Sequence, residues 1–236
     1  MKNRLYFLLF SPTLFSCTGI RKPLNNLPSN AISHTEFSKN FTIETHTFGN
    51  NLAHFSRENV SLNNNQVVLS VTAKGINNRQ YSGAEIRSKQ FFLYGTFNAT
   101  IKTTEALGCI TAFFLYKPKS KKNTEIDFEI SGKYPNLVTL NHWVDKNSNG
   151  KDMELPFNTS NAYHNYTIIW LPNKITWLID RAVIYSTTKA VPNKAMQIVF
   201  NLWVTNSVTW AGQIQDHKLP TYAYLKSVSF NPYKIK

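Results

Sequence analysis

The chain has 236 residues, of which 42% are hydrophobic and 14% aromatic, and this composition excludes an intrinsically disordered protein. A body of about 200 residues can bury a complete sandwich core without a metal ion or a disulfide to hold it together. Lys and Arg number 26 against 13 acidic residues, and the formal net charge of +13 favours anionic partners. Nucleic acid, an acidic or sulfated glycan and a lipopolysaccharide-rich envelope all fit that charge.

The N-terminus has the pattern of a secretory signal. A basic start precedes an apolar stretch, Leu5 to Phe10, that is too short to span a bilayer permanently. The stretch ends in Leu14-Phe-Ser-Cys17, which resembles the lipobox of bacterial lipoproteins. We therefore predict a signal peptide over residues 1–16, cleaved before Cys17, and a lipid attached to Cys17. An ordinary secretory signal is the alternative; in the favoured case the protein is secreted and membrane-anchored, facing the periplasm or the outside.

Residues 17–33 are rich in Gly, Pro, Asn and Ser and are predicted to be a flexible tether before a single domain over residues 34–236. The chain has two cysteines, Cys17 and Cys109, so acylation of Cys17 leaves no intramolecular disulfide. Cys109 lies in an apolar run and is predicted to be a small buried hydrophobic residue.

The domain is divided into short segments of strand length, bounded by Asn, Gly and Pro. None of its segments shows a helical period sustained over three turns. Three of the predicted strands form a meander with tight turns at Pro172-Asn173 and Asp180-Arg181. Many short strands separated by turns indicate an all-β sandwich or barrel. The predicted strands include 66–72, 94–102, 166–170, 175–179 and 183–185.

One predicted strand, Thr124 to Ile130, carries an acidic face. Its strict alternation puts Glu125, Asp127 and Glu129 on one side and apolar residues on the other. Carboxylates two residues apart lie roughly 7 Å from each other and repel, and acidic residues are poor strand formers. Such local conflict indicates a functional site. The alternative is a solvated edge strand kept from pairing by its charge.

The spacing of the acidic face suits double displacement at a glycosidic bond. Retaining glycosidases use two carboxyl groups about 5–5.5 Å apart, one as the nucleophile and one as the general acid/base. Glu125 and Glu129 have Cα atoms roughly 13 Å apart on an extended strand, and inward-leaning side chains on a curved strand can bring their carboxyls to that distance. Asp127 between them would share a proton and separate their pKa values.

The segment Glu125-Ile-Asp-Phe-Glu129 resembles the catalytic signature of glycoside hydrolase family 16, nearest to its lichenase (endo-β-1,3-1,4-glucanase) and xyloglucan transglycosylase branch. The resemblance implies a concanavalin-like β-jelly-roll sandwich of two curved antiparallel sheets with a concave glycan cleft. It also implies endo-acting, retaining hydrolysis of a β-linked polysaccharide, either β-1,3-1,4- or β-1,3-glucan-like. Further segments that carry it are Tyr81–Ser88, Tyr94–Phe97, Thr111–Tyr116, His164–Trp170, Phe200–Trp203 and Trp210–Gly212.

The same resemblance implies that Glu125 is the nucleophile and Glu129 the general acid/base, with Asp127 orienting Glu125. The residues themselves predict different environments for the two glutamates. Glu125 follows a lysine-rich loop, which should keep it ionised, whereas Glu129 lies near two anions, which should raise its pKa.

Two Asn-x-Trp pairs are predicted to bind sugar, because an amide can bond hydroxyls and an aromatic plate can stack on a sugar ring. In each pair the Asn and the Trp lie on one strand face, and burial of the Trp in the core is the alternative. The resemblance places both pairs in the cleft together with Glu85 and Arg87, which otherwise form a surface pair. Trp170 and Trp177 are assigned to the core. The predicted sugar-binding residues are Glu85, Arg87, Tyr116, Asn141, Trp143, Asn201, Trp203 and Trp210.

Some positions depart from the family pattern and leave the exact glycan open. Ser82 stands where close lichenases carry Cys, residues 50–59 lack the usual Tyr- and Asn-bearing loop, and Asn123 replaces an aromatic residue. Residues 117–122 contain four lysines, which either form a solvated loop or grip an acidic or sulfated polymer.

Other functions fit parts of the pattern: a transglycosylase on the same site, a basic nuclease holding Mg²⁺ with the acidic row, or a silent glycan-binding module. The favoured interpretation requires no cofactor and no catalytic metal, and the sequence does not show whether a structural Ca²⁺ is bound. The expected partners are a polysaccharide substrate and a membrane reached only through the lipid anchor. No nucleic acid is expected, and the protein is predicted to be a monomer.

Overall fold

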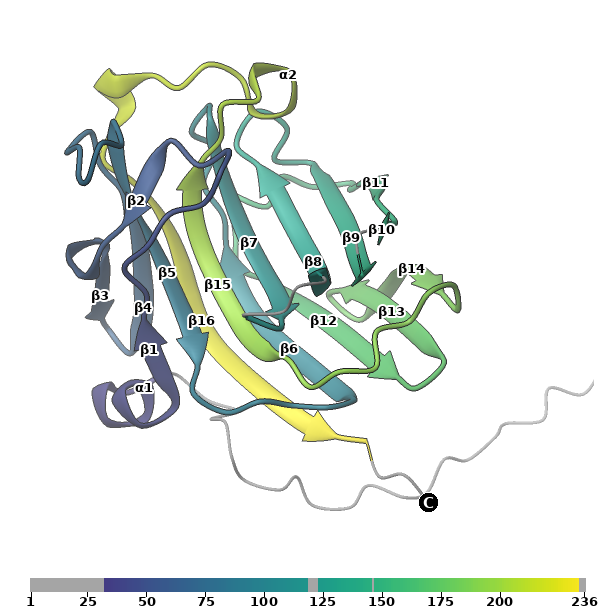
Figure 1. Cartoon of the computed structure of the whole chain (residues 1–236). Helices are drawn as coiled ribbons and strands as arrows, with labels where there is room; N and C mark the ends of the chain where they lie inside the picture. The colour runs from purple at the N-terminus through teal and green to yellow at the C-terminus, as the bar shows by residue number, and fades with distance from the viewer. Residues whose placement is uncertain (1–31, 119–122, 146, 234–236) are drawn as a thin grey trace, which may run out of the picture.

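The structure, a computed structural model, describes residues 32–118, 123–145 and 147–233. The predicted signal peptide, Cys17 and lysines 119, 121 and 122 lie outside these residues. Two sheets stack face to face, and both curve so that one presents a concave outer surface (Figure 1). Nearly all strand pairs are antiparallel, which confirms the predicted all-β sandwich.

The first sheet carries the acidic strand in its interior. Its strands run in the order β1-β5-β15-β7-β8-β9-β10, with β11 also paired to β9 and β2 paired in parallel to β5. The strands are β1 (Phe41–Ile43), β2 (Ala53–Phe55), β5 (Tyr81–Ser88), β7 (Cys109–Tyr116), β8 (Asn123–Ser131), β9 (Leu137–Asp145), β10 (Asn147–Ser148), β11 (Lys151–Glu154) and β15 (Gln197–Val204).

The second sheet has the order β14-β13-β12-β6-β16-β4-β3. The meander predicted from the two turns is confirmed, because β12, β13 and β14 pair in succession. Asp180 and Arg181 both have positive φ, as a two-residue hairpin turn requires. The strands are β3 (Val60–Asn63), β4 (Gln66–Val71), β6 (Gly95–Lys102), β12 (His164–Leu171), β13 (Lys174–Ile179), β14 (Ala182–Thr187) and β16 (Thr221–Pro232).

Short helices lie outside the sheets: α1 (His34–Asn40), α2 (Val208–Ala211) and the 3-10 turns η1 (Arg57–Asn59) and η2 (Asp216–Lys218). Ser33 and Glu36 form a capping box that begins α1, and Ile32 is fully buried. These contacts attach residues 32 and 33, at the end of the predicted tether, to the folded body. Among the described residues, no helix is long and apolar enough to cross a membrane.

The core fills the space between the two sheets. Trp170 and Trp177 are fully buried there, as predicted, and the apolar face of β8 packs into the same cluster through Phe128 and its neighbours. Cys109 is a buried free thiol whose pKa is raised to about 12 by burial, which confirms its assignment as a small core residue. Because β8 buries its apolar face in this core, its acidic face must point to the concave outer surface.

Candidate active site

The acidic row lies in the middle of the first sheet, not at its edge. β8 is paired along its length with β7 on one side and β9 on the other. Asp127 is almost completely buried, and Glu125 and Glu129 are half-buried. The alternative of a charged edge strand is therefore wrong.

A cleft of about 490 Å³ lies over this row. Its lining contains every predicted catalytic and sugar-binding residue: Glu85, Arg87, Tyr116, Glu125, Asp127, Glu129, Asn141, Trp143, Asn201, Trp203 and Trp210. The strand pairing explains why residues so far apart in sequence meet. The side chains point outward from β5, β15, β7, β8 and β9, which are neighbours in one concave sheet, and Trp210 is added from α2.

The register across β7, β8 and β9 places a different pair of neighbours beside each carboxyl. Glu125 lies opposite Tyr116 on one side and Trp143 on the other. Asp127 lies opposite Phe114 and Asn141. The nucleophile candidate is thus flanked by two aromatic rings, which can exclude water and pack against the apolar face of a sugar.

All three carboxyls of the row have raised pKa values. Burial is the largest cause for Glu125, followed by the negative charges of Glu129 and Glu85, and together they raise its pKa to about 8. Burial raises the pKa of Glu129 to about 7, and it raises the pKa of Asp127 well above its usual range. The predicted direction is confirmed for Glu129, but the cause is burial and not the two neighbouring anions.

The sequence predicted that the lysine-rich loop keeps Glu125 ionised, whereas the pKa of this carboxyl is raised. Burial and two nearby carboxylates outweigh the favourable charge of Arg87 and the hydrogen bond from Asp127. Three of the four lysines that were predicted to keep Glu125 ionised, at positions 119, 121 and 122, lie outside the described residues. Sequence spacing could place positive charge beside Glu125, but it could not show how completely the cleft removes that carboxyl from water.

Glu125 and Asp127 share a side-chain hydrogen bond, and it lowers the pKa of Glu125 while raising that of Asp127. The proton therefore belongs to Asp127, which donates it to the Glu125 carboxylate. The second oxygen of Asp127, Oδ1, is buried without a hydrogen-bond partner. An unpaired buried oxygen is far less costly on a neutral acid than on a carboxylate, so it also indicates a protonated Asp127.

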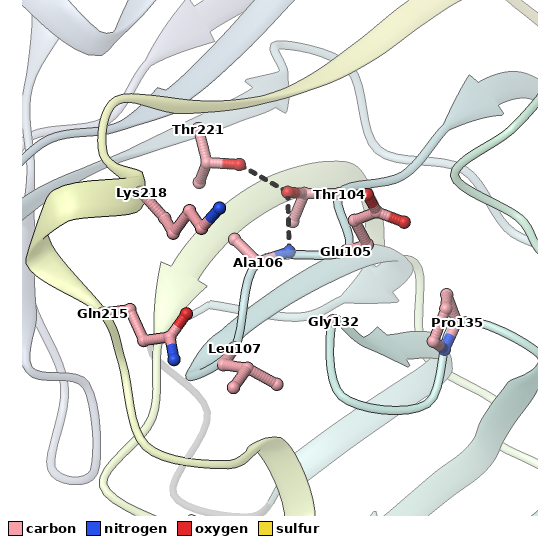
Figure 2. Close-up of a pocket in the computed structure, with 9 residues that line it drawn as sticks. All are labelled: Thr104, Glu105, Ala106, Leu107, Gly132, Pro135, Gln215, Lys218 and Thr221. Atoms are coloured by element: carbon pink, nitrogen blue, oxygen red, sulfur yellow. Dashed lines mark hydrogen bonds between the residues drawn. The ribbon is translucent and has the colours of Figure 1, made fainter.

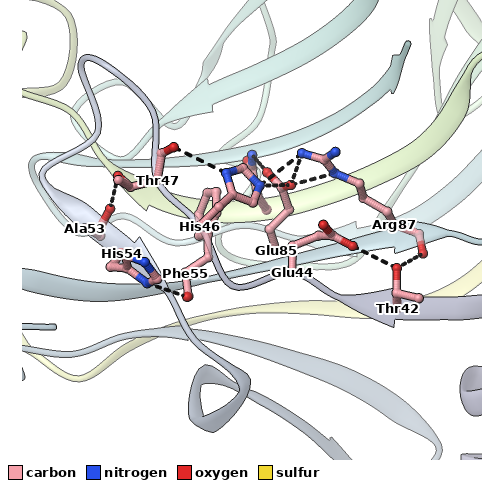
Figure 3. Close-up of polar contacts among 10 residues, drawn as sticks. Thr42, Glu44, His46, Thr47, Ala53, His54, Phe55, Glu85 and Arg87 are labelled. Atoms are coloured by element: carbon pink, nitrogen blue, oxygen red, sulfur yellow. Dashed lines mark hydrogen bonds and ion pairs between the residues drawn. The ribbon is translucent and has the colours of Figure 1, made fainter. Parts of the chain in front are cut away.

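Glu85 lies on β5, separated from the acidic strand β8 by β15 and β7, and is held in a dense polar cluster (Figure 3). Its Oε1 lies 2.6 Å from Arg87 Nη2 and 3.0 Å from His46 Nε2, and its Oε2 accepts from Asn201 Nδ2 at 3.1 Å. Burial alone would raise the pKa of Glu85, but these partners outweigh it and the pKa lies below its usual value. Since Glu85 is only 2% exposed, the alternative of a surface pair is wrong.

Aromatic rings form the walls at both ends of the cleft. The guanidinium of Arg87 lies over the Tyr116 ring, 5.4 Å from its centroid. Trp203 packs edge-on against Trp210, with centroids 6.0 Å apart, and against Phe48 at 4.9 Å. Trp203 is only 6% exposed and anchors a small apolar cluster, so it serves both as a cleft wall and as local core.

Sequence reasoning missed five residues that line the cleft: His46, Phe48, Asn50, Ala112 and Phe114. The first three recur at every second position, a signal that could have been recognised in the segment between β1 and β2. Asn50 lines the cleft from the start of the segment, residues 50–59, that lacks the usual Tyr- and Asn-bearing loop. Ser82, in place of a cysteine, is buried and hydrogen-bonds Thr72 through its hydroxyl at 2.7 Å.

A second cavity, of about 460 Å³, lies among loops at one end of the sandwich (Figure 2). Thr104 and Thr221 hydrogen-bond each other through their hydroxyls there, and Lys218 and Glu105 also line the cavity. It contains none of the predicted site residues. Within the described parts of the chain, no group of three or more His, Cys, Asp or Glu side chains is arranged to hold a metal ion.

A curved sandwich with a carboxyl row on the floor of an aromatic, amide-lined cleft defines a carbohydrate-cleaving enzyme of the β-jelly-roll class. The model of glycosyl hydrolases family 16 matches residues 46–221. The chain belongs to this family and is a glycosidase.

Curated relatives agree with this assignment. The endo-1,3-1,4-β-glycanase ExoK of Rhizobium meliloti is 30% identical over 182 residues, which cover 75% of this chain and 67% of the relative. The β-glucanase of Bacillus subtilis is 30% identical over 177 residues, covering 73% and 72%. A xylanase/β-glucanase of Ruminococcus flavefaciens is also 30% identical, but the match spans only 23% of that longer protein.

Solved structures share the fold. A β-1,3-1,4-glucanase (lichenase) derived from a mouse hindgut metagenome superposes with a TM-score of 0.78 at 25% identity, covering 83% of this chain and 94% of that one. The β-glucanase of Bacillus licheniformis gives a TM-score of 0.76 at 24% identity, covering 89% and 96%. The predicted jelly-roll sandwich is thereby confirmed.

Proposed function

We propose that this chain cleaves internal bonds of a β-1,3-1,4-linked glucan and retains the β configuration at the cleaved carbon. The observation that carries the proposal is the hydrogen-bonded Glu125–Asp127 pair with Glu129 on the same strand, inside an aromatic cleft. The names of the relatives support this glucan as the substrate, and an open cleft lined from several strands suits a chain that continues beyond the site.

The reaction assigns one role to each carboxyl. Glu125 attacks the anomeric carbon as its carboxylate, the form that the hydrogen bond from Asp127 favours, and forms a glycosyl ester. Glu129 gives its proton to the departing glycosidic oxygen. Glu129 then takes a proton from water, whose oxygen attacks the same carbon and releases Glu125. Asp127 holds Glu125 in place through both steps.

The glutamates repel each other in a buried site, so ionisation of one keeps the proton on the other. With the pKa of Glu129 at about 7 and that of Glu125 at about 8, the empty site loses its first proton from Glu129. The reaction needs that proton on Glu129 and the charge on Glu125, the arrangement that the hydrogen bond from Asp127 favours. Glu85, Arg87 and Asn201 would bond sugar hydroxyls, and Trp143, Trp203 and Trp210 would stack on sugar rings.

A screen of the purified protein against mixed-linkage glucan, laminarin, xyloglucan, agar, carrageenan and chitin oligomers tests the substrate. Mixed-linkage glucan should be cleaved fastest, with internal products, and proton NMR should show the β-anomer first. An added sugar acceptor distinguishes a transglycosylase, which would form longer products. DNA cleavage abolished by a chelator would instead support the nuclease, and binding without turnover the silent module.

We propose further that the enzyme is made with a signal peptide over residues 1–16 and works as a monomer anchored by a lipid on Cys17. The basic start, the short apolar stretch and the sequence Leu14-Phe-Ser-Cys17 support the anchor. Light scattering on the Cys17→Ser protein, which keeps the whole folded body, tests whether it is monomeric.

A further inference from the structure

His46 is a cleft residue that the catalytic scheme does not use. It lies in the segment between β1 and β2, and its ring packs edge-on against Phe55 with centroids 5.3 Å apart. The ring's Nε2 points at the pair formed by Glu85 and Arg87 (Figure 3). His46 therefore contacts the polar cluster at one end of the cleft directly.

The Nε2 atom of His46 faces two partners of opposite kind. It lies 3.0 Å from Oε1 of Glu85, which can only accept when ionised, and 3.0 Å from Nη2 of Arg87, which can only donate. The other ring nitrogen, Nδ1, faces the carbonyl of Thr47 at 3.3 Å and so carries hydrogen. A protonated His46 donates from Nε2 to Glu85, whereas a neutral His46 accepts there from Arg87. Its charge state thus decides which of the two it holds.

The two oxygens of Glu85 are used unequally. Oε1 lies 3.0 Å from His46 Nε2, and it accepts hydrogen bonds from Arg87 Nε at 2.8 Å and from Arg87 Nη2 at 2.6 Å. Oε2 accepts one hydrogen bond, from Asn201 Nδ2 at 3.1 Å. It can accept a further hydrogen bond from another donor, such as a sugar hydroxyl. Holding Oε1 firmly therefore orients the carboxylate that would bind the glycan through Oε2.

We propose that His46 is a positioning residue for the glycan: its protonated ring, together with Arg87, fixes Glu85 as a hydroxyl acceptor, and affinity falls when the ring is neutral. The identity of the glycan rests on the function proposed above. The mutual arrangement of the three side chains does not depend on it.

The charged surroundings give the direction of the pH effect. The hydrogen bond to Glu85 is the largest cause that raises the pKa of His46, while Arg87 opposes protonation. Tyr116 faces Arg87 from β7, and the charge of Glu125 on β8 acts on the same cluster. Since the pKa of His46 is raised above 6.5, tight binding should be present at low pH and be lost as the pH rises through that raised pKa.

The test measures glycan affinity without turnover. A Glu129→Gln protein serves as the reference, because it leaves the Glu125–Asp127 pair intact, and calorimetry follows its binding of a mixed-linkage glucan oligosaccharide from about pH 5 to about pH 9. In that background, His46→Gln keeps a donor that does not titrate, and His46→Leu removes the donor. His54→Gln is the matched control, since His54 bonds Phe55 and Asn77 and does not line the cleft.

The Kd of the reference and of the His54 control should rise roughly three- to tenfold across the His46 titration, the effect of one hydrogen bond. His46→Gln should bind as tightly as the reference at low pH and show no such rise, and His46→Leu should bind weakly at every pH. An unchanged pH dependence in His46→Gln, or tight binding by His46→Leu, would overturn the proposal.

A ligand-free measurement separates this proposal from the choice of substrate. Nitrogen-15 NMR of wild-type protein should show the Arg87 guanidinium signals moving with the titration of His46, and His46→Gln should abolish that movement. If Arg87 does not respond, the proposal is wrong. If it responds but no β-glucan oligosaccharide binds at any pH, the proposed substrate is wrong, and the inference about His46 stands.

Discussion

The indole Nε1 of Trp177, on β13 of the second sheet, donates a hydrogen bond across the core to the backbone carbonyl of Asp127, 3.1 Å away. It ties the midpoint of the acidic row to the opposite sheet. Trp177→Phe should therefore destabilise the protein by about 1–3 kcal/mol and also lower kcat, because the strand that carries the row loses its support.

Trp170 provides the matched control for that substitution. It is equally buried, and its Nε1 donates to the carbonyl of Pro192 at 2.9 Å, away from the acidic row. Trp170→Phe should cost similar stability while leaving kcat near the wild-type value. Thermal unfolding and initial rates on both variants check this, and equal effects on kcat would contradict a specific role for the Trp177 contact.

A second prediction concerns stability and pH. The raised pKa of Glu125 means that folding favours its neutral form, so its contribution to stability is full below the usual value of 4.5 and is lost as the pH rises through about 8. Glu125→Gln cannot ionise. It should match wild type at low pH and become more stable by about 1–3 kcal/mol near pH 8, as measured by denaturant unfolding. A constant difference across this range would show that the carboxyl is not perturbed.

Much of this site could be predicted because the strand period is strict. Alternation alone assigns Glu125, Asp127 and Glu129 to one face, and the apolar partners Ile126 and Phe128 assign the other face to the core. Alternation along one strand does not show which other strands lie beside it. It cannot show that β7 and β9 enclose the row, and so it cannot show that burial dominates the pKa of Glu125.

His46 illustrates the other limit. It lies outside any named strand and is separated from Glu85 by 39 positions in sequence. The contact depends on how the segment between β1 and β2 crosses β5, which no local pattern encodes. The resemblance to the family predicted Glu85 as a cleft residue, with Arg87 as its one named neighbour. Its burial and its additional partners required the fold.

A third prediction concerns the lysine-rich stretch. If Lys117 and the lysines at positions 119, 121 and 122 grip an anionic glycan, replacing all four with Gln should raise KM on that glycan several-fold and flatten its dependence on salt. Kinetics on carrageenan and on neutral glucan at low and high salt make the comparison. Unchanged constants on every substrate would identify the stretch as a solvated loop.

A fourth prediction concerns the anchor. Cys17→Ser should prevent lipid attachment and move the protein from the detergent-rich to the aqueous phase, because a lipid chain supplies most of the membrane affinity of such a protein. Phase partitioning and intact mass measure this, and Ser16→Ala, which keeps the cysteine, is the control. A Cys17→Ser protein that fractionates like wild type would leave an ordinary secretory signal as the explanation.

The last prediction separates the roles of the two glutamates. Glu125→Ala removes the proposed nucleophile, so turnover should fall by several orders of magnitude, and added azide should restore it by attacking the anomeric carbon from the vacated side. The product is then a glycosyl azide of inverted, α configuration.

Glu129→Ala removes only the proton donor, so substrates whose leaving group needs no proton should still form the ester on Glu125. Azide then attacks that ester and gives a β-glycosyl azide, with configuration retained. Asp127→Asn is the control: it keeps a donor to Glu125 and should retain measurable turnover without azide. Proton NMR distinguishes the anomers. An α-azide from Glu129→Ala, or an α-anomer as the first product of the wild-type enzyme, would exclude double displacement through Glu125.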